Sequence, residues 1–288
     1  MGKNQYGFEI QVKVFTKTGN LTYEYSKNES KSIEIHFTVP FSTESEKQIS
    51  EIVLYNINPG HFNSIDRGDR VELYAGYHGD TGLLMKGTIF RKTVPTLEDV
   101  DTAYTLRVLE GTDYTRLGKQ NITFAKGTYA DTIVKEVVRR SGIKLNYMNI
   151  NKNKRYDEEY TAEGHPMEIL EQLADDTKTS LFYLRGQLTW GFIFSSRNSE
   201  TFNLNVDTGL IGTPTAESRD DDWQDGDDDD GYGQYSFSVE SILNYHITSF
   251  ARVNVKSKYF NHGMYVMSGE HTFDGEEART NFEGIENW

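Results

Sequence analysis

Alternation of apolar and polar residues dominates the first part of the chain. Every second residue is apolar between Phe8 and Val14, and again between Ile33 and Val39. A period of two is typical of a half-buried strand. Four further strands are predicted between turn residues, at Glu51–Asn56, Arg70–Gly76, Leu83–Phe90 and Tyr104–Glu110. Six short strands with one apolar face each favour closure, so residues 1–111 are predicted to form a β-barrel.

The apolar pattern changes its period after residue 111. Between Thr128 and Ser141 the apolar residues fall on one helical stripe, with Thr128 as the expected N-cap. A second helix is predicted from Pro166 to Thr177. Two apolar runs then flank Arg185-Gly186, which predicts a tight hairpin. Residues 112–206 are therefore expected to form a small α+β domain with two helices.

An acidic run interrupts the second half of the chain. Eight aspartates lie between Asp220 and Asp230. Because like charges repel and cannot be buried, residues 207–234 are expected to form a flexible connector. Alternation then returns in three segments: Tyr235–Glu240, Arg252–Ser257 and Met264–Ser268. The last stretch is short for an independent barrel. Residues 235–288 are therefore expected to complete a second barrel with strands from elsewhere in the chain or from neighbouring subunits.

These segments predict an α+β protein that is predominantly β, with two β-barrel-like domains and a small α/β domain between them. The composition fits this class, because 18 tyrosines and 16 phenylalanines favour strands and protein contacts. There is no cysteine, which excludes disulfide scaffolds, cysteine hydrolases and thiolate zinc sites. We expect no membrane span, because no stretch approaches about 18 apolar residues. We see no secretory signal and expect the chain to fold in the cytoplasm where it is made.

The formal charge of the chain is −14, and the acidic run contributes eight of the negative charges. The remainder is only mildly acidic and shows no dense cluster of Lys and Arg. Phosphate affinity depends on such clusters, so we expect no specific nucleic-acid binding.

One metal site competes with the solvated loop as an interpretation of the acidic run. Asp225, Asp227 and Asp229 have the alternating spacing that begins a calcium loop. The sixth position of that loop would be Asp230 instead of glycine, and the twelfth would be Ser236, which cannot chelate with two oxygens. A solvated loop is favoured, and calcium remains the weaker alternative. We predict no other metal ligands, no cofactor and no catalytic residues.

Two other motifs are interpreted as ordinary structure. Arg67-Gly68-Asp69 matches a cell-adhesion tripeptide, but its position before an alternating segment predicts a turn that leads into a strand. The seven histidines lack zinc-binding spacing, and we expect them at the surface or in turns.

A diffuse pattern of turns and strands covers nearly the whole chain and resembles a known family. Its members often carry a strand ending in Tyr-Asn, a Gly-Asp turn before a strand ending in Gly-Tyr, and a Gly-x-Ile strand. Here these features lie in Ile52–Gly60, Ile65–Tyr77 and Gly87–Arg91. Five further segments fit the same pattern: Gly127–Val134, Gly164–Leu170, Thr208–Pro214, Ser241–Asn244 and Gly263–Val266. The chain thus resembles the hub proteins of phage tail baseplates and of related contractile injection machines. It departs from them in Tyr245–Ala251, which lacks the usual Pro-Gly turn, and in the acidic run.

The resemblance implies a non-enzymatic structural subunit of a virion tail or baseplate. Such a hub forms a ring, usually a homotrimer, in which two similar barrels per chain offer six near-equivalent positions. The implied partners are the sixfold tail tube, a threefold spike or tail-tip protein and other baseplate proteins. The ring would let DNA pass during ejection. The alternative function is a tail component that binds host glycans or degrades the cell wall, because paired carboxylates meet in space rather than in sequence.

Overall fold

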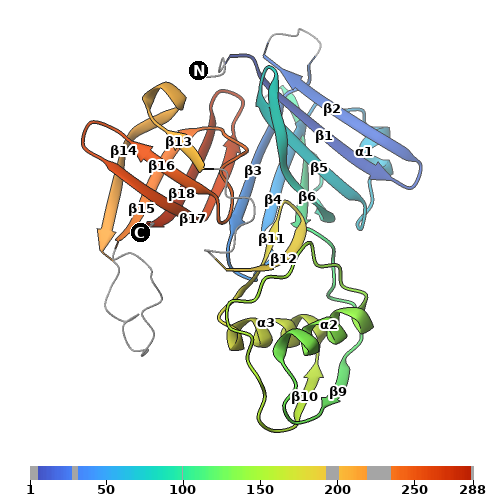
Figure 1. The fold of residues 1–288 in the computed structure, drawn as a ribbon. Coiled ribbons are helices and arrows are strands. Elements are labelled where there is room, and N and C mark those ends of the chain that lie inside the picture. Colours follow the sequence, from blue (N-terminus) through green and yellow to red (C-terminus); the bar gives the residue numbers. More distant parts are fainter. Residues whose placement is uncertain (1–5, 28–31, 99, 193–200, 219–234, 287–288) are drawn as a thin grey trace.

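One large sheet of fourteen strands dominates the computed structural model, which describes residues 6–27, 32–98, 100–192, 201–218 and 235–286 (Figure 1). Its strands run along the path β14-β15-β18-β17-β3-β4-β8-β6-β5-β1-β2, with β7, β13 and β16 attached at the sides. The ladders are antiparallel except for the parallel pair of β13 and β16. The protein is thus predominantly β, as the alternating patterns predict.

The N-terminal part contributes eight strands: β1 (Phe8–Thr16), β2 (Gly19–Ser26), β3 (Ile35–Ser42), β4 (Ile49–Tyr55), β5 (Arg70–Tyr77), β6 (Asp80–Lys92), β7 (Thr96–Glu98) and β8 (Asp101–Glu110). Their apolar positions form one core, in which Val12, Val71 and Leu106 are fully buried. A short helix, α1 (Pro59–Ser64), replaces the turn expected at Asn-Pro-Gly. It forms because the Asn58 side chain accepts a hydrogen bond from Gly60 N at 2.7 Å.

The C-terminal part adds six strands: β13 (Thr201–Leu204), β14 (Leu210–Ser218), β15 (Tyr235–Ile242), β16 (Arg252–Lys256), β17 (Asn261–Phe273) and β18 (Ala278–Glu286). The 3₁₀ helix η2 (Val206–Thr208) separates β13 from β14. Strand β17 joins the two parts, because Ser268–Phe273 pairs with β3. A second apolar core, with Val253 and Met264 at its centre, lies on this part of the sheet.

The predicted connector over 207–234 is wrong for its first half. Residues 210–218 form β14, which pairs with β15 through Ser218↔Tyr235. The strand precedes the acidic run directly. The connector was predicted from the charge of that run, and the weak alternation of residues 210–218 was not enough to indicate a strand. Closure of either part into a barrel stays a prediction, because the described ladders form one open path with β2 and β14 at its ends.

The middle part packs two helices beside two small hairpins: β9 (Gln120–Phe124) with β10 (Tyr160–Gly164), and β11 (Ser180–Leu184) with β12 (Gln187–Gly191). Helices α2 (Ala130–Ser141) and α3 (Pro166–Asp176) bury Val137, Leu170 and Leu173 against Trp190. Helix α2 ends as predicted at Gly142, whose φ of +72° suits glycine. Its N-cap is Tyr129 and not Thr128, whose hydroxyl donates to Ala125 O instead.

Candidate functional site

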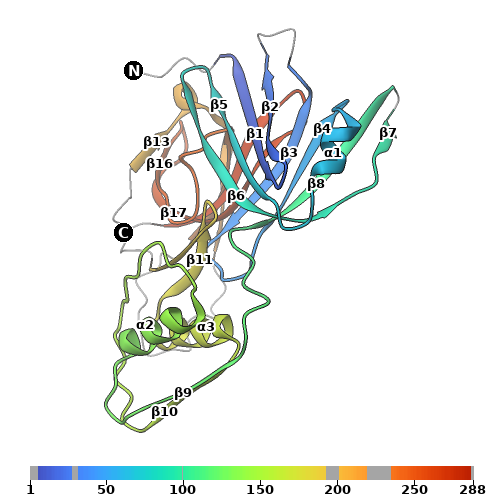
Figure 2. The same ribbon diagram turned by 90° about the vertical axis from the view of Figure 1, so that its right-hand side faces the viewer.

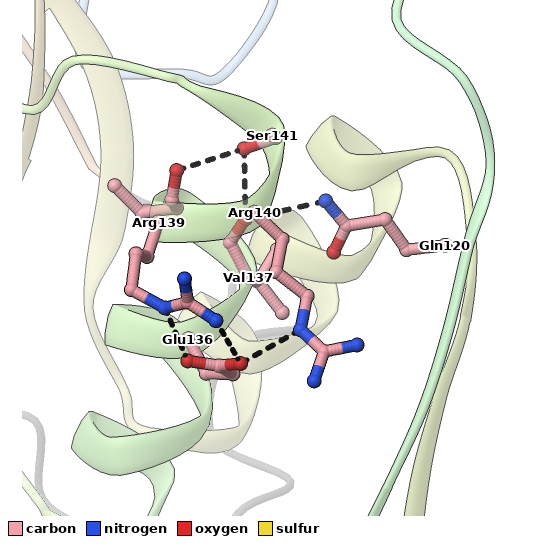
Figure 3. Close-up of polar contacts among 7 residues, drawn as sticks. Gln120, Glu136, Val137, Arg139, Arg140 and Ser141 are labelled. Atoms are coloured by element: carbon pink, nitrogen blue, oxygen red, sulfur yellow. Dashed lines mark hydrogen bonds and ion pairs between the residues drawn. The ribbon is translucent and has the colours of Figure 1, made fainter.

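Helix α2 and strand β9 form a shallow, open pocket on the outer side of the middle part. The helix buries Ile133, Val134 and Val137 and turns its charged residues outward. The start of β9 is tied to it, because Gln120 Nε2 donates to Val137 O at 3.3 Å (Figure 3). The open pocket has a volume of about 430 Å³. We call its lining the α2–β9 face: Ile122, Thr123, Phe124, Thr132, Lys135, Glu136, Arg139 and Arg140.

Glu136 organises the two arginines of this face. Its carboxylate accepts hydrogen bonds from Arg139 Nε at 2.8 Å and from Arg139 Nη2 at 2.7 Å. Arg140 Nε donates to the same carboxylate at 2.7 Å, from the next position along the helix (Figure 3). The hydrogen bonds from Arg139 and Arg140 lower the pKa of Glu136 to about 2. The carboxylate therefore stays ionised and holds both guanidinium groups at the surface.

The positive charge of this region extends beyond the pocket. Between Tyr114 and Arg155 the sequence has ten Lys and Arg residues against two acids, Asp131 and Glu136. Lys119 and Lys126 are exposed and flank β9 at its two ends. This part of the chain therefore has a formal charge of +8 (10 − 2), although its cations are spread along the segment and form no dense cluster in the sequence.

A second candidate site is the junction where the β11–β12 hairpin meets the large sheet. Gly186 N donates to Glu110 Oε1 at 3.0 Å, which fixes the hairpin tip on β8. The backbone approaches so closely that a Cβ on Gly186 would lie 2.1 Å from Lys86 O. On the other side, Arg185 donates to the carbonyl oxygen of Tyr245. The hairpin tip therefore contacts both the N-terminal and the C-terminal parts of the chain (Figure 1).

Aromatic packing reinforces this junction. The Phe182 ring on β11 meets the Phe250 ring edge to face, with centroids 4.7 Å apart. Both rings are buried in a small cluster with Tyr265 and Ile285. Tyr245 also donates from its hydroxyl to Asp80 Oδ1 at 2.9 Å, so the C-terminal part contacts β6 directly. The junction is thus a packed and hydrogen-bonded contact among three parts of the chain.

Two buried ionisable side chains lie at or near the junction. Burial raises the pKa of Glu110 to about 8, although the hydrogen bond from Gly186 opposes this rise. Burial, with a smaller contribution from the charge of Arg185, lowers the pKa of His271 to about 3. Its Nδ1 is hydrogen-bonded to Thr280 Oγ1 at 2.8 Å. The expectation of surface or turn histidines is wrong for His271, because its strand position faces the interior.

A third feature is an arm with exposed apolar side chains that leads from β6 to β8. Val94, Leu97 and Val100 are 83%, 75% and 88% exposed. Strand β7 lies in this arm and pairs only with the start of β8 in the described part of the sheet (Figure 2). Exposed apolar residues are common singly, but three within seven residues of one arm form a patch suited to contact with another protein.

The proposed metal ligands Asp225, Asp227 and Asp229 lie outside the described residues. Within the described ranges, no group of three or more His, Asp or Glu side chains could hold a metal ion. Asp69, from the Arg-Gly-Asp tripeptide, accepts a hydrogen bond from Asp66 N at 2.8 Å immediately before β5, which confirms the predicted turn. In the part of the chain that the structure describes, no helix is long and apolar enough to span a membrane.

Comparison with known proteins identifies the fold. No protein-family model and no curated protein matches the sequence. A tail protein from Neisseria meningitidis has a similar structure, with a TM-score of 0.66, 12% identity, and coverage of 98% of this chain and 97% of that one. The 43 kDa tail protein of prophage MuSo2 from Shewanella oneidensis gives a TM-score of 0.64 at 11% identity, with coverage of 96% and 98%.

A third similar structure comes from an injection machine. It is a component of the Escherichia coli type VI secretion system that is itself similar to the T4 phage tail proteins gp27 and gp5. The TM-score is 0.60 at 11% identity, and the match covers 91% of this chain and 76% of that one. The chain therefore has the fold of these phage tail proteins over nearly its whole length. This confirms the resemblance that the turn and strand pattern indicates.

Proposed function

We propose that the chain is a non-enzymatic structural subunit of a phage-type tail, and that three copies form a hub ring in its baseplate. The observation that carries the proposal is the tail-protein fold along 98% of the chain. In this proposal the ring joins a sixfold tail tube to a threefold spike or tail-tip protein and leaves a channel for DNA.

The arrangement of the sheet supports a role in assembly. Two apolar cores lie on one continuous sheet, the first with the N-terminal strands and the second with the C-terminal strands. If each part acts as one barrel-like module, three chains present six comparable positions to a sixfold tube. We accordingly propose three domains, residues 1–111, 112–206 and 235–288, with a connector over 207–234. In this division the third domain recruits β13 from the middle segment and β14 from the connector, because they pair with β16 and β15.

Edges of the sheet offer the contacts that a ring needs. Strands β2 and β14 stand at the ends of the sheet path, and each is in a ladder with only one described strand. Open edges of this kind pair readily with a neighbouring chain. The exposed apolar arm at Val94, Leu97 and Val100 adds a patch that loses contact with water when it is covered.

The junction at the hairpin tip would keep the modules in a fixed relation. Gly186 and Arg185 bind the two β parts through hydrogen bonds. A ring built this way needs the two β parts of each chain in a fixed orientation. If they moved relative to each other, the six positions offered to the tail tube would no longer be equivalent.

Native mass spectrometry of the purified chain, alone and with its spike and tube proteins, tests the proposal. Three copies of the 33.0 kDa chain give a species of about 99 kDa. Replacing the three arm residues with Asp should shift the population to monomer, while circular dichroism stays unchanged because these side chains are exposed. Exposed Lys256→Asp and Lys258→Asp serve as controls for added negative charge. A monomer under all conditions, or hydrolysis of host cell wall by the chain, contradicts the proposal.

A further inference from the structure

We propose that the α2–β9 face is a docking surface for the acidic run, Asp220–Asp230, of a second copy of this chain. The proposal that this face binds the acidic run does not depend on the ring. The proposal that the run comes from a neighbouring copy rests on the ring proposed above.

Charge complementarity is the first argument. The segment from Tyr114 to Arg155 has the ten cations and two acids described above, in a chain of net charge −14. The acidic run has eight aspartates in eleven residues and no cation. Opposite charges concentrated on two separate parts of one chain attract each other between copies and steer their approach.

The preorganised arginines are the second argument. Glu136 accepts from Nε and Nη2 of Arg139 but only from Nε of Arg140. The three contacts fix both guanidinium groups on one side of the helix (Figure 3). The remaining N–H groups can therefore donate to incoming carboxylates without the full loss of side-chain freedom that binding costs.

The shape and chemistry of the pocket are the third argument. Ile122 and Phe124 supply apolar lining, while Lys135, Arg139 and Arg140 supply the charges around it. The volume of about 430 Å³ lies in the range of pockets that hold a compact ligand group. The acidic run contains one aromatic residue, Trp223, between two groups of aspartates. Indole rings are frequent interface anchors, and here the ring would enter the pocket while the flanking carboxylates reach the cations.

Nucleic acid is the competing anionic occupant, and the face suits it less. The central group of the arginine cluster is a carboxylate, and Lys135 is paired with Asp131 at 2.6 Å. These two acids repel phosphates and carboxylates alike, so the preference for the acidic run rests on Trp223, which the apolar lining of the pocket can hold. The acidic run is also present at high effective concentration once copies of the chain assemble.

A peptide-binding assay tests the face. The probe is a fluorescein-labelled peptide of residues 219–231, and the protein is the full chain with the eight aspartates of its own run changed to Asn. We expect Arg139→Gln with Arg140→Gln to weaken binding roughly tenfold or more at low salt. Lys256→Gln with Lys258→Gln removes the same charge at exposed positions near β16 and should change binding less than about twofold.

The peptide with Trp223→Ala should also bind more weakly, because the pocket would lose its aromatic occupant. No measurable binding, equal losses in both double variants, or tighter binding of an 11-nucleotide DNA of mixed sequence would overturn the proposal. Circular dichroism of Arg139→Gln with Arg140→Gln confirms that α2 remains folded. A chain that binds the peptide but never assembles would refute the proposed ring and leave the face intact.

Zero-length cross-linking of carboxylates to amines tests the source of the run. Equal amounts of ¹⁵N-labelled and unlabelled chain are mixed under assembling conditions, and cross-links from Lys135 to the acidic run are sequenced by mass spectrometry. Mixed-isotope pairs are expected from docking between copies. Pairs that always carry one isotope would place the run on the face of its own chain and overturn the assignment to a second copy.

Discussion

Replacing Glu110 with Gln should change how the stability of the protein depends on pH. Glu110 is 5% exposed, and burial raises the pKa of its carboxyl from 4.5 to about 8 in the folded protein. Between these values the folded state keeps a proton that the unfolded state has released, so the free energy of unfolding falls as pH rises. Each pH unit in this window lowers it by about 1.4 kcal/mol. Below pH 4.5 both states are protonated, and the contribution to stability is complete.

In Glu110→Gln the side-chain amide cannot ionise, but its oxygen can still accept the hydrogen bond from Gly186 N. From pH 5.5 to pH 7.5 the free energy of unfolding of the wild type should therefore fall by about 2.5 kcal/mol relative to that of Glu110→Gln. Urea unfolding of both proteins at the two pH values measures this difference, and the other titrating groups cancel in it. Exposed Glu44→Gln controls for the loss of one acidic group. The free energies of unfolding of wild type and Glu110→Gln are compared at each pH. If their difference changes by less than about 0.5 kcal/mol between pH 5.5 and pH 7.5, Glu110 is not a buried, protonated group.

Two further substitutions test the junction. Gly186→Ala should lower the free energy of unfolding by about 3 kcal/mol, because φ is +81° and the new Cβ would meet Lys86 O. Thermal unfolding measures this loss of stability. If Gly186→Ala is as stable as wild type, the hairpin tip does not pack closely against Lys86. Phe182→Ala should cost about 3 to 5 kcal/mol by removing the ring that packs on Phe250. In Phe182→Ala, amide hydrogen exchange should increase over wild type more around Phe250 than in the distant β1 core. An equal increase in both places would contradict the packing.

Local periodicity predicted those elements whose residues follow one pattern without interruption. The alternation from Phe8 to Val14 lies within β1, and the helical stripe that ends at Gly142 lies within α2. The tight turn at Arg185-Gly186 joins β11 to β12 as expected. In these segments one face of the element is buried along its whole length, so the spacing of apolar residues in the sequence matches the spacing of buried residues in the structure.

Features that depend on distant partners could not be predicted in this way. Nothing near Glu110 in sequence indicates that a glycine 76 positions later donates to it. His271 is buried because its strand pairs with both β3 and β18, a register that only the tertiary fold defines. Strand β14 was hidden by the adjacent charge. The α2–β9 face was missed because only the tertiary fold places its apolar lining from β9, Ile122 and Phe124, beside the cations of α2.

The three-domain division could be stated from sequence but is still a proposal. The structure pairs β17 with β3, so the N-terminal and C-terminal strands share one sheet. It also pairs β13, which lies within residues 112–206, with β16 of the third segment. Strand order in a sheet depends on long-range pairing, whereas composition and periodicity report only local structure. Proteolysis of the full chain, followed by mass analysis of stable fragments, would test whether residues 112–206 persist as one unit.

Electron cryomicroscopy of the assembled tail most directly tests the central claim that this chain is a ring-forming structural subunit. The account predicts three copies around the tail axis, with the two β parts of each chain alternating to give six similar positions toward the tube. A map that shows the chain as a single copy on the periphery, or as copies that do not close around the axis, would contradict it.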